Sequence, residues 1–120
     1  MKGSFLKIAF FVIVLFCTQV AFGQSGKVVC YDDNRWYQDV WIDAPYFNGD
    51  LATEVADENN IADAWIQWDG GRVTKYCGAG ATNCGWENIG RQDAGGVNVS
   101  IGCETYGSGS WSVAEVWAEW

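Results

Sequence analysis

Apolar residues between Gln24 and Trp120 occur in short runs rich in Val, Ile, Trp and Tyr, separated by clusters of Gly, Asn and Asp. This pattern is typical of β-strands joined by turns, and no long amphipathic helix is visible. The runs predict six strands, at Lys27–Tyr31, Trp36–Asp43, Ala62–Trp68, Arg72–Cys77, Gly96–Cys103 and Ser110–Trp120. Six or seven strands favour an all-β fold, a small antiparallel sandwich or barrel.

Two connecting segments carry more specific signals. Asp69–Gly71 (DGG) lies between two predicted strands and predicts a tight hairpin turn. Leu51–Asn60 (LATEVADENN) is the one stretch with helical character after residue 23, and we expect it to form one or two helical turns.

The first 23 residues have the composition of a secretory signal peptide. Lys2 and Lys7 provide positive charge, Ile8–Cys17 is apolar, and Ala21–Gly23 has small residues before the expected cleavage site. We therefore expect a secreted, extracellular protein whose residues 24–120 form a single β domain.

Charge limits the partners of that domain. Removing Lys2 and Lys7 leaves five basic residues against 15 acidic ones, a net charge of −10. Such a surface repels phosphate backbones and anionic lipids. We expect no nucleic-acid partner and no membrane insertion by the mature form.

Four cysteines remain after the signal, and an even number in an exported chain predicts two disulfides. Of the three possible pairings, we favour Cys77 with Cys84 across a short loop, and Cys30 with Cys103 between an early and a late strand. A zinc site is disfavoured because the chain has no C-x2-C pair and no histidine. The disulfides are expected to stabilise the domain.

One local pattern, a tryptophan between two polar residues, occurs in three predicted strands. Side chains alternate faces along a strand, so each tryptophan shares a face with the polar residues two positions away, while aliphatic neighbours point the other way. The three sets are Trp41 with Asp39 and Asp43, Trp65 with Asp63 and Gln67, and Trp117 with Glu115 and Glu119.

Such a face offers an aromatic plane for the C–H face of a sugar and oxygen atoms for its hydroxyls. These nine residues are therefore our candidate ligand-binding residues, and a neutral glycan is the expected ligand. The alternative is that the tryptophans pack against one another across strands and the acids only keep the surface soluble. Core packing is the default for the other tryptophans, Trp36, Trp68, Trp86, Trp111 and Trp120.

Oxygen-rich clusters at Asp32–Asn34 and at Asp57–Asn60 with Asp63 are either solvated loops or a calcium site, although neither has the ligand spacing of an EF-hand. We expect no other cofactor. Without histidine a Ser-His-Asp or Cys-His relay cannot form, so no enzyme activity is expected. Asn98–Ser100 (NVS) is a sequon that predicts glycosylation of Asn98 in a eukaryotic host.

Val28–Trp36 (VVCYDDNRW) resembles the opening of a βγ-crystallin Greek-key motif, with a tyrosine that ends a strand followed five residues later by a second aromatic residue. Gly71–Tyr76 (GRVTKY) is similar to the start of a second such motif. The resemblance implies a Greek-key β domain in which Asn59, Asn60 and Asp63 hold calcium.

The sequence thus favours a small secreted, disulfide-bonded binding module that holds a neutral glycan. Two alternatives stay open. One is a secreted effector, toxin or inhibitor that acts on an extracellular protein, since aromatic residues are frequent interaction hot spots. The other is a calcium-binding structural protein.

Overall fold

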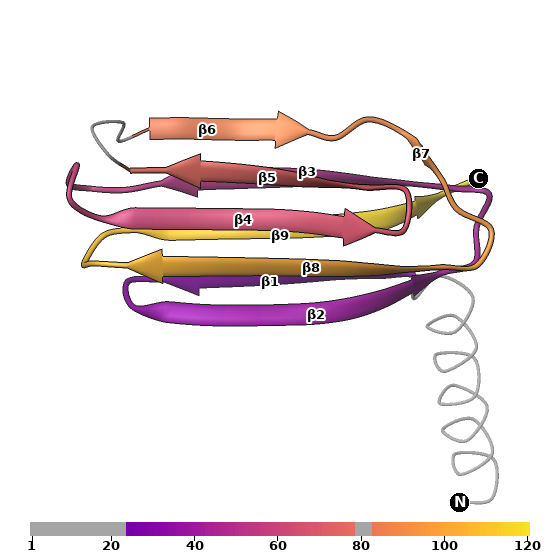
Figure 1. Ribbon diagram of the computed structural model, residues 1–120, viewed down its shortest axis with the longest axis horizontal. Coiled ribbons are helices and arrows are strands. Elements are labelled where there is room, and N and C mark those ends of the chain that lie inside the picture. The colour runs from indigo at the N-terminus through magenta and orange to yellow at the C-terminus, as the bar shows by residue number, and fades with distance from the viewer. Residues whose placement is uncertain (1–23, 79–82) are drawn as a thin grey trace, which may run out of the picture.

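The computed structural model describes residues 24–78 and 83–120, so the predicted signal peptide lies outside the described residues. The described segments contain no helix, and hence none able to span a membrane. They form nine strands (Figure 1). These are β1 (Ser25–Tyr31), β2 (Asn34–Ile42), β3 (Tyr46–Glu54), β4 (Ile61–Trp68), β5 (Gly71–Cys77), β6 (Asn83–Asn88), β7 (Gln92–Asp93), β8 (Val97–Tyr106) and β9 (Trp111–Glu119).

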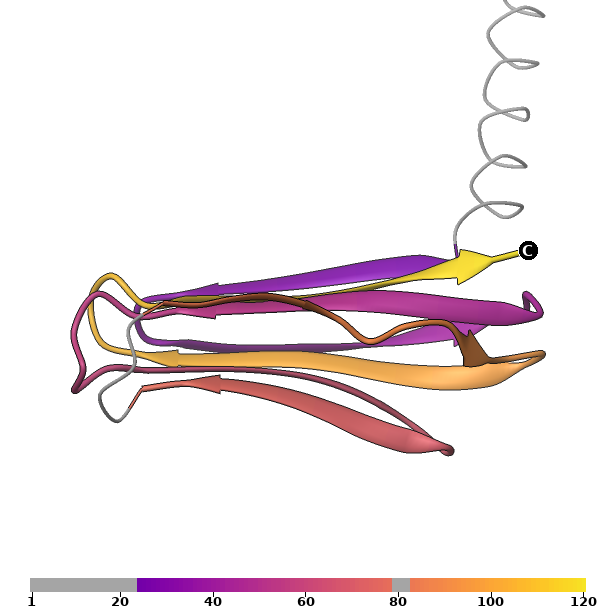
Figure 2. The same ribbon diagram turned by 90° about the horizontal axis from the view of Figure 1, so that it is seen from above.

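The strands form two antiparallel sheets that pack face to face (Figure 2). Sheet A has the order β1-β9-β3-β6, and β7 pairs with β3. Sheet B has the order β2-β8-β4-β5. Every connection along the chain passes from one sheet to the other, except the β4–β5 hairpin in sheet B and the β6–β7 connection in sheet A. Apart from the two-residue β7, the two sheets have four strands each, and this order and connectivity make a jelly-roll sandwich, which confirms the predicted fold class.

The six predicted strands correspond to β1, β2, β4, β5, β8 and β9. The hairpin prediction is also confirmed, because β4 ends at Trp68, β5 begins at Gly71, and these two residues pair. The prediction missed β3, β6 and the two-residue β7.

The expected helical character of Leu51–Asn60 is wrong. Leu51 to Glu54 form the end of β3, which pairs with β9 on one side and β6 on the other, and a turn follows. Leu51, Ala52 and Thr53 are all buried. Hydrogen bonding on both sides and burial on both faces therefore override the local helical preference.

The core lies between the sheets and is built from alternate residues of each strand. Its fully buried members are mostly aliphatic, and Phe47 is the largest of them. Trp68 packs against this core, edge-on to Phe47, with ring centroids 5.3 Å apart. Other members include Val28, Ile42, Leu51, Ala64, Ile66, Val99, Ile101, Ala114 and Val116.

None of the eight tryptophans is fully buried. Core packing holds for Trp68 but is wrong for Trp36, Trp86 and Trp120, which are exposed, and Trp111 lies half-buried on the outer face of sheet A. The inner faces of packed sheets lie only about 10 Å apart. Phe47, alanines and aliphatic side chains fill that layer, so most indoles lie outside it.

Both disulfides join the two sheets, and they have the favoured pairing. Cys30 of β1 is bonded to Cys103 of β8, with Cα atoms 5.9 Å apart. Cys77 of β5 is bonded to Cys84 of β6, with Cα atoms 5.8 Å apart. Disulfides of this kind are typical of exported proteins.

The two bridges should contribute unequally to stability, because a cross-link stabilises mainly by restricting the unfolded chain. Their sequence separations are 73 and 7 residues. Replacing Cys30 and Cys103 by Ala should lower the free energy of unfolding by about 4 kcal/mol, and replacing Cys77 and Cys84 by about 2 kcal/mol. Urea unfolding followed by tryptophan fluorescence measures both losses, and equal losses would contradict the loop-length explanation.

Candidate functional site

The alternation predicted around the bracketed tryptophans is present in all three strands. Val40 and Ile42 of β2, Ala64 and Ile66 of β4, and Val116 of β9 point into the core. The intervening tryptophans therefore point outward. Trp41 is exposed and Trp65 is half-buried, and both lie on the outer face of sheet B.

Trp117 lies on the other side of the molecule, because β9 belongs to sheet A. The expectation of one surface carrying all three tryptophans is therefore wrong. Sequence spacing fixes the face of each strand, but it does not fix the sheet to which a strand belongs.

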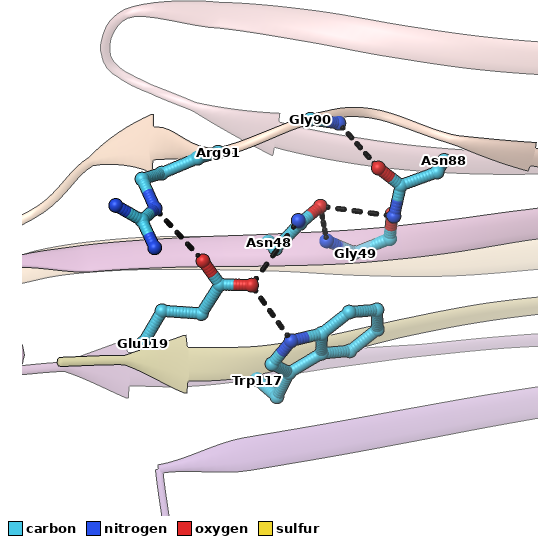
Figure 3. A network of polar contacts seen from close by, with 7 residues as sticks. All are labelled: Asn48, Gly49, Asn88, Gly90, Arg91, Trp117 and Glu119. Atoms are coloured by element: carbon cyan, nitrogen blue, oxygen red, sulfur yellow. Dashed lines mark hydrogen bonds and ion pairs between the residues drawn. The ribbon is translucent and has the colours of Figure 1, made fainter.

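The acids beside Trp117 are engaged within the protein, and Figure 3 shows the contacts of Glu119. Glu119 accepts hydrogen bonds from Arg91 Nε at 3.0 Å, Asn48 Nδ2 at 3.2 Å and Trp117 Nε1 at 3.3 Å. These donors, Arg91 first, lower the pKa of Glu119. Glu115 Oε2 lies 4.0 Å from Lys27 Nζ. Trp117, Glu115 and Glu119 thus belong to a network of hydrogen bonds and ion pairs on the surface of sheet A.

On sheet B, strand pairing brings other side chains beside Trp65. One row across the sheet contains Tyr37, Gly102, Trp65 and Thr74. The row on one side of it contains Asp39, Ser100, Gln67 and Arg72, and the row on the other side contains Arg35, Glu104, Asp63 and Tyr76. We call these twelve residues the sheet B face. An aromatic row thus lies between two polar rows.

Gly102 determines how Trp65 lies on this face. A Cβ atom added at Gly102 would be 2.0 Å from Cζ2 and 2.2 Å from Cε2 of Trp65. The six-membered ring of the indole therefore rests directly on the backbone of β8. One side of the ring contacts the sheet, and the half-buried side chain keeps part of its surface in contact with solvent.

Tyr37 is on the far side of Gly102 in the same row and is 71% exposed. Its Cα lies two strands from that of Trp65, about 10 Å away at normal strand spacing. Trp65 and Tyr37 together form an aromatic strip across three strands, β2, β8 and β4.

Hydrogen bonds order the polar row on one side of this strip. Ser100 Oγ donates to Asp39 Oδ1 at 2.6 Å, and Arg72 Nη1 donates to Gln67 Oε1 at 2.6 Å. The Arg72 guanidinium carbon also lies 5.6 Å from the centroid of the Trp65 ring, within the range of a cation–π contact.

The other polar row contains two carboxylates directly opposite each other, Asp63 on β4 and Glu104 on β8. Burial raises the pKa of Asp63, and the negative charge of Glu104 raises it further. Asp63 Oδ1 is enclosed and has no hydrogen-bond partner among the described residues. Glu104 accepts a hydrogen bond from the Tyr106 hydroxyl. The Asp63 carboxylate thus has one oxygen without a donor, although it accepts a hydrogen bond from the Ala64 backbone N–H, which lowers its pKa.

Trp41 lies farther along the same face and is 59% exposed. It pairs with Asn98 of β8, so its Cα lies about 16 Å from that of Trp65. Asn98, the predicted glycosylation site, is exposed beside it. Asp43 lies just beyond β2, and its backbone N–H donates to Gln24 Oε1. Trp41 and Asp43 therefore form a separate, peripheral part of the candidate site.

The candidate calcium ligands have separate contacts within the protein. Asn60 Nδ2 donates to the Ser108 carbonyl at 2.9 Å, and Asn59 donates to Asp57 through its backbone and side chain. Asp63 is on the sheet B face instead. No group of three or more acidic or cysteine side chains in the described segments is arranged to hold a metal ion.

The aspartates of the first oxygen-rich cluster bind the loop between β8 and β9. Asp33 Oδ1 accepts from the Gly107 N–H at 3.0 Å, and Asp32 Oδ1 accepts from the Gly109 N–H at 2.8 Å. Together with the Asn60 bond to Ser108, these contacts join three loops at one end of the sandwich. The side chains of Asp32, Asp33 and Asn60 therefore have a structural role here.

Sequence reasoning missed several residues of the sheet B face, notably Tyr37, Gly102, Arg72 and Glu104. The spacing of Tyr37 relative to Asp39 and Trp41 places all three on one face of β2, so Tyr37 was within reach of the same argument. The neighbours from β8 and β5 depend on strand register, which the sequence pattern does not specify.

No protein-family model and no curated protein matches this chain. Among solved structures, the chain is similar to the carbohydrate-binding module TmCBM61 in complex with beta-1,4-galactotriose (12% identity, 81% of this chain and 83% of that chain covered, TM-score 0.42). It is also similar to a de novo designed double-stranded beta-helix (9% identity, 79% and 97% covered, TM-score 0.35) and to VP2 of the infectious bursal disease virus subviral particle (16% identity, 79% and 32% covered, TM-score 0.37). Similarities at this level place no constraint on ligand or function.

The contact between Trp65 and Gly102 predicts that the effects of substituting these two residues on stability are coupled. Gly102→Ala should lower the free energy of unfolding by about 1–3 kcal/mol, because the new methyl group displaces the indole. In a Trp65→Ala background the same change should be neutral or stabilising, since alanine is favoured over glycine within a strand. Urea unfolding of the four proteins gives the coupling energy. If Gly102→Ala lowers the free energy of unfolding equally in wild type and in Trp65→Ala, the contact is disproved.

Proposed function

We propose that this chain is a secreted binding module that holds a neutral glycan on the sheet B face. The observation that carries the proposal is the Trp65 ring lying on Gly102 between two polar rows. A flat aromatic ring suits the C–H face of a pyranose, and polar groups on both sides suit the hydroxyls around its edge.

Each part of the face has a role in this proposal. Trp65 and Tyr37 form the stacking strip, and sugar rings lie along it. Asp39, Gln67 and Asp63 accept hydrogen bonds from hydroxyl groups, whereas Arg72 donates to hydroxyl or ring oxygens. Trp41 contacts a more distant part of an extended chain. The proposed function is binding without catalysis.

Charge also favours a neutral ligand. The mature chain carries a net charge of −10, and the sheet B face has three carboxylates, Asp39, Asp63 and Glu104, against two guanidinium groups, Arg35 and Arg72. Phosphorylated or sulfated ligands would be repelled at long range. Neutral hydroxyl groups instead supply hydrogen-bond donors for the carboxylate and amide oxygens of the two polar rows.

Titration calorimetry with neutral β-linked oligosaccharides of glucose, mannose and galactose tests the proposal. We expect at least one to bind, and we expect Trp65→Ala and Tyr37→Ala to lower its affinity about tenfold or more. The protein should carry an unmodified Asn98, because a glycan there would lie beside Trp41.

Trp86→Ala is the control, because Trp86 is an exposed tryptophan that lies on sheet A. It should leave sugar affinity unchanged. Failure of every neutral oligosaccharide to bind, or full affinity in Trp65→Ala, would overturn the proposal.

Sugar affinity should fall as the pH falls through the raised pKa of Asp63. A hydrogen bond to a carboxylate is about 1 kcal/mol stronger than one to a neutral group, so protonation should weaken binding about fivefold. Asp63 itself does not cause unfolding there, because a pKa raised in the folded state means that protonation favours the fold. Affinities of wild type and Asp63→Asn between pH 7 and pH 4 measure the effect, which the variant should lack. An identical pH profile in the variant would exclude Asp63 from the site.

A further inference from the structure

A second aromatic surface lies on the opposite side of the sandwich, over sheet A. It is a hollow of about 180 Å³ lined by Lys27, Val29, Tyr31, Trp86, Trp111 and Val113. We call this set the sheet A hollow. Tyr31 and Trp86 are 63% and 59% exposed. Large apolar side chains left in solvent beside a hollow are typical of interaction sites.

The walls of the hollow come from strands that are not neighbours. Trp86 is on β6 and Trp111 on β9, with β3 between them. Their ring centroids are 6.4 Å apart and the rings are inclined at 52°. Trp86 pairs with Ala52 of β3, whose small side chain leaves room for the indole to extend toward Trp111. The inclined rings thus form two walls over a small residue.

One of these walls is held firmly and the other is open to solvent. Trp111 Nε1 donates to Glu54 Oε2 at 3.1 Å, and the ring is half-buried. Val113, 3% exposed, is buried in the same set. A volume near 180 Å³ compares with the roughly 150 Å³ cavity that holds one benzene ring. The hollow therefore has the size for a single large side chain of a partner.

The chemistry of the lining separates this hollow from the sheet B face. Four of its six residues are Val or Trp, and the polar atoms of the lining side chains are limited to the Lys27 ammonium, the Tyr31 hydroxyl and the two indole N–H groups, one of them engaged by Glu54. The hydroxyl groups of a sugar that face the lining would find few side-chain partners there, which is costly. An apolar side chain has no such requirement.

The charge around the hollow determines which residues are favoured beside that side chain in a partner. Lys27 is paired with Glu115, and Arg91 with Glu119. Asp50 and Glu54 accept hydrogen bonds from the neutral donors Asn88 and Trp111, and neither has an ion-pair partner among the described residues. The outer face of sheet A therefore carries excess negative charge. A second copy of this acidic chain would be repelled, and a basic partner would be attracted.

We propose that the sheet A hollow is a docking site for a basic extracellular protein. The partner inserts one large apolar side chain between Trp86, Trp111 and Tyr31, and its neighbouring Lys or Arg residues lie against Asp50 and Glu54. An aromatic anchor in a small pocket, surrounded by complementary charges, is a common hot-spot arrangement. This site is separate from the proposed glycan face, and the two can be tested independently.

Three synthetic peptides serve as probes: Ac-KKWKK-NH2, Ac-KKGKK-NH2 and Ac-EEWEE-NH2. They are titrated into the ¹⁵N-labelled oxidised protein, and the indole N–H signals report on each tryptophan. We expect Ac-KKWKK-NH2 to shift the Trp86 and Trp111 signals and to bind about tenfold or more tightly than the other two. Trp86→Ala should reduce its affinity about tenfold or more. Asp50→Asn should reduce both its affinity and the salt dependence of binding.

Trp41→Ala is the matched control, since its side chain has the same exposed fraction on the opposite sheet and should leave peptide affinity unchanged. Three outcomes would overturn the proposal: equal binding of the two lysine-rich peptides, full affinity in Trp86→Ala, or shifts of the Trp86 signal by neutral oligosaccharides. Self-association in sedimentation experiments that Trp86→Ala abolishes would assign the hollow to a second copy and would also overturn it. Failure of sugar binding in Trp65→Ala tests only the sheet B face.

Discussion

The packing of two sheets through one thin layer of aliphatic side chains is the constraint on which the rest of this structure depends. Each long strand contributes alternate residues to that layer. Two disulfides bond the sheets together: Cys30–Cys103 lies within the layer, and Cys77–Cys84 lies in a second, smaller buried cluster. A layer about 10 Å thick has little room for indoles. Only Trp68 packs against the core, beside Phe47, and the remaining tryptophans lie on the outer faces or at their margins. Surface aromatic residues thus follow from how the core is filled.

The two outer faces use their tryptophans differently. On sheet B, Gly102 lets Trp65 lie on the sheet backbone, and polar rows border it on both sides. On sheet A, Ala52 pairs with Trp86 on one side and Val113 on the other, and the inclined rings of Trp86 and Trp111 border a hollow lined by aromatic and aliphatic side chains. In both cases a small residue on a central strand makes room for aromatic side chains of neighbouring strands. The flat polar face suits hydroxylated ligands, and the hollow suits an apolar side chain, because buried polar groups require partners.

Much of the fold could be predicted because its signal is local. Runs such as Ala62–Trp68 alternate between small or aliphatic and polar or aromatic residues, and the Asp69–Gly70 turn follows directly. Tyr46–Glu54 escaped prediction because Leu51 to Glu54 have residues common in helices, and only pairing with both β9 and β6 makes them a strand. The contact of Asn60 escaped prediction for a similar reason, because this side chain binds the β8–β9 loop, which is distant in sequence.

The sequence by itself determined which side chains of each strand point outward, since the two-residue period of a strand is a local property. It therefore places Trp41, Trp65 and Trp117 on outer faces, and it favours one cysteine pairing among three without deciding it. Only the tertiary structure decided that Trp117 belongs to the opposite sheet and that Gly102, Glu104 and Arg72 surround Trp65. Those neighbours depend on strand order and register, which are set by pairings between residues far apart in the chain.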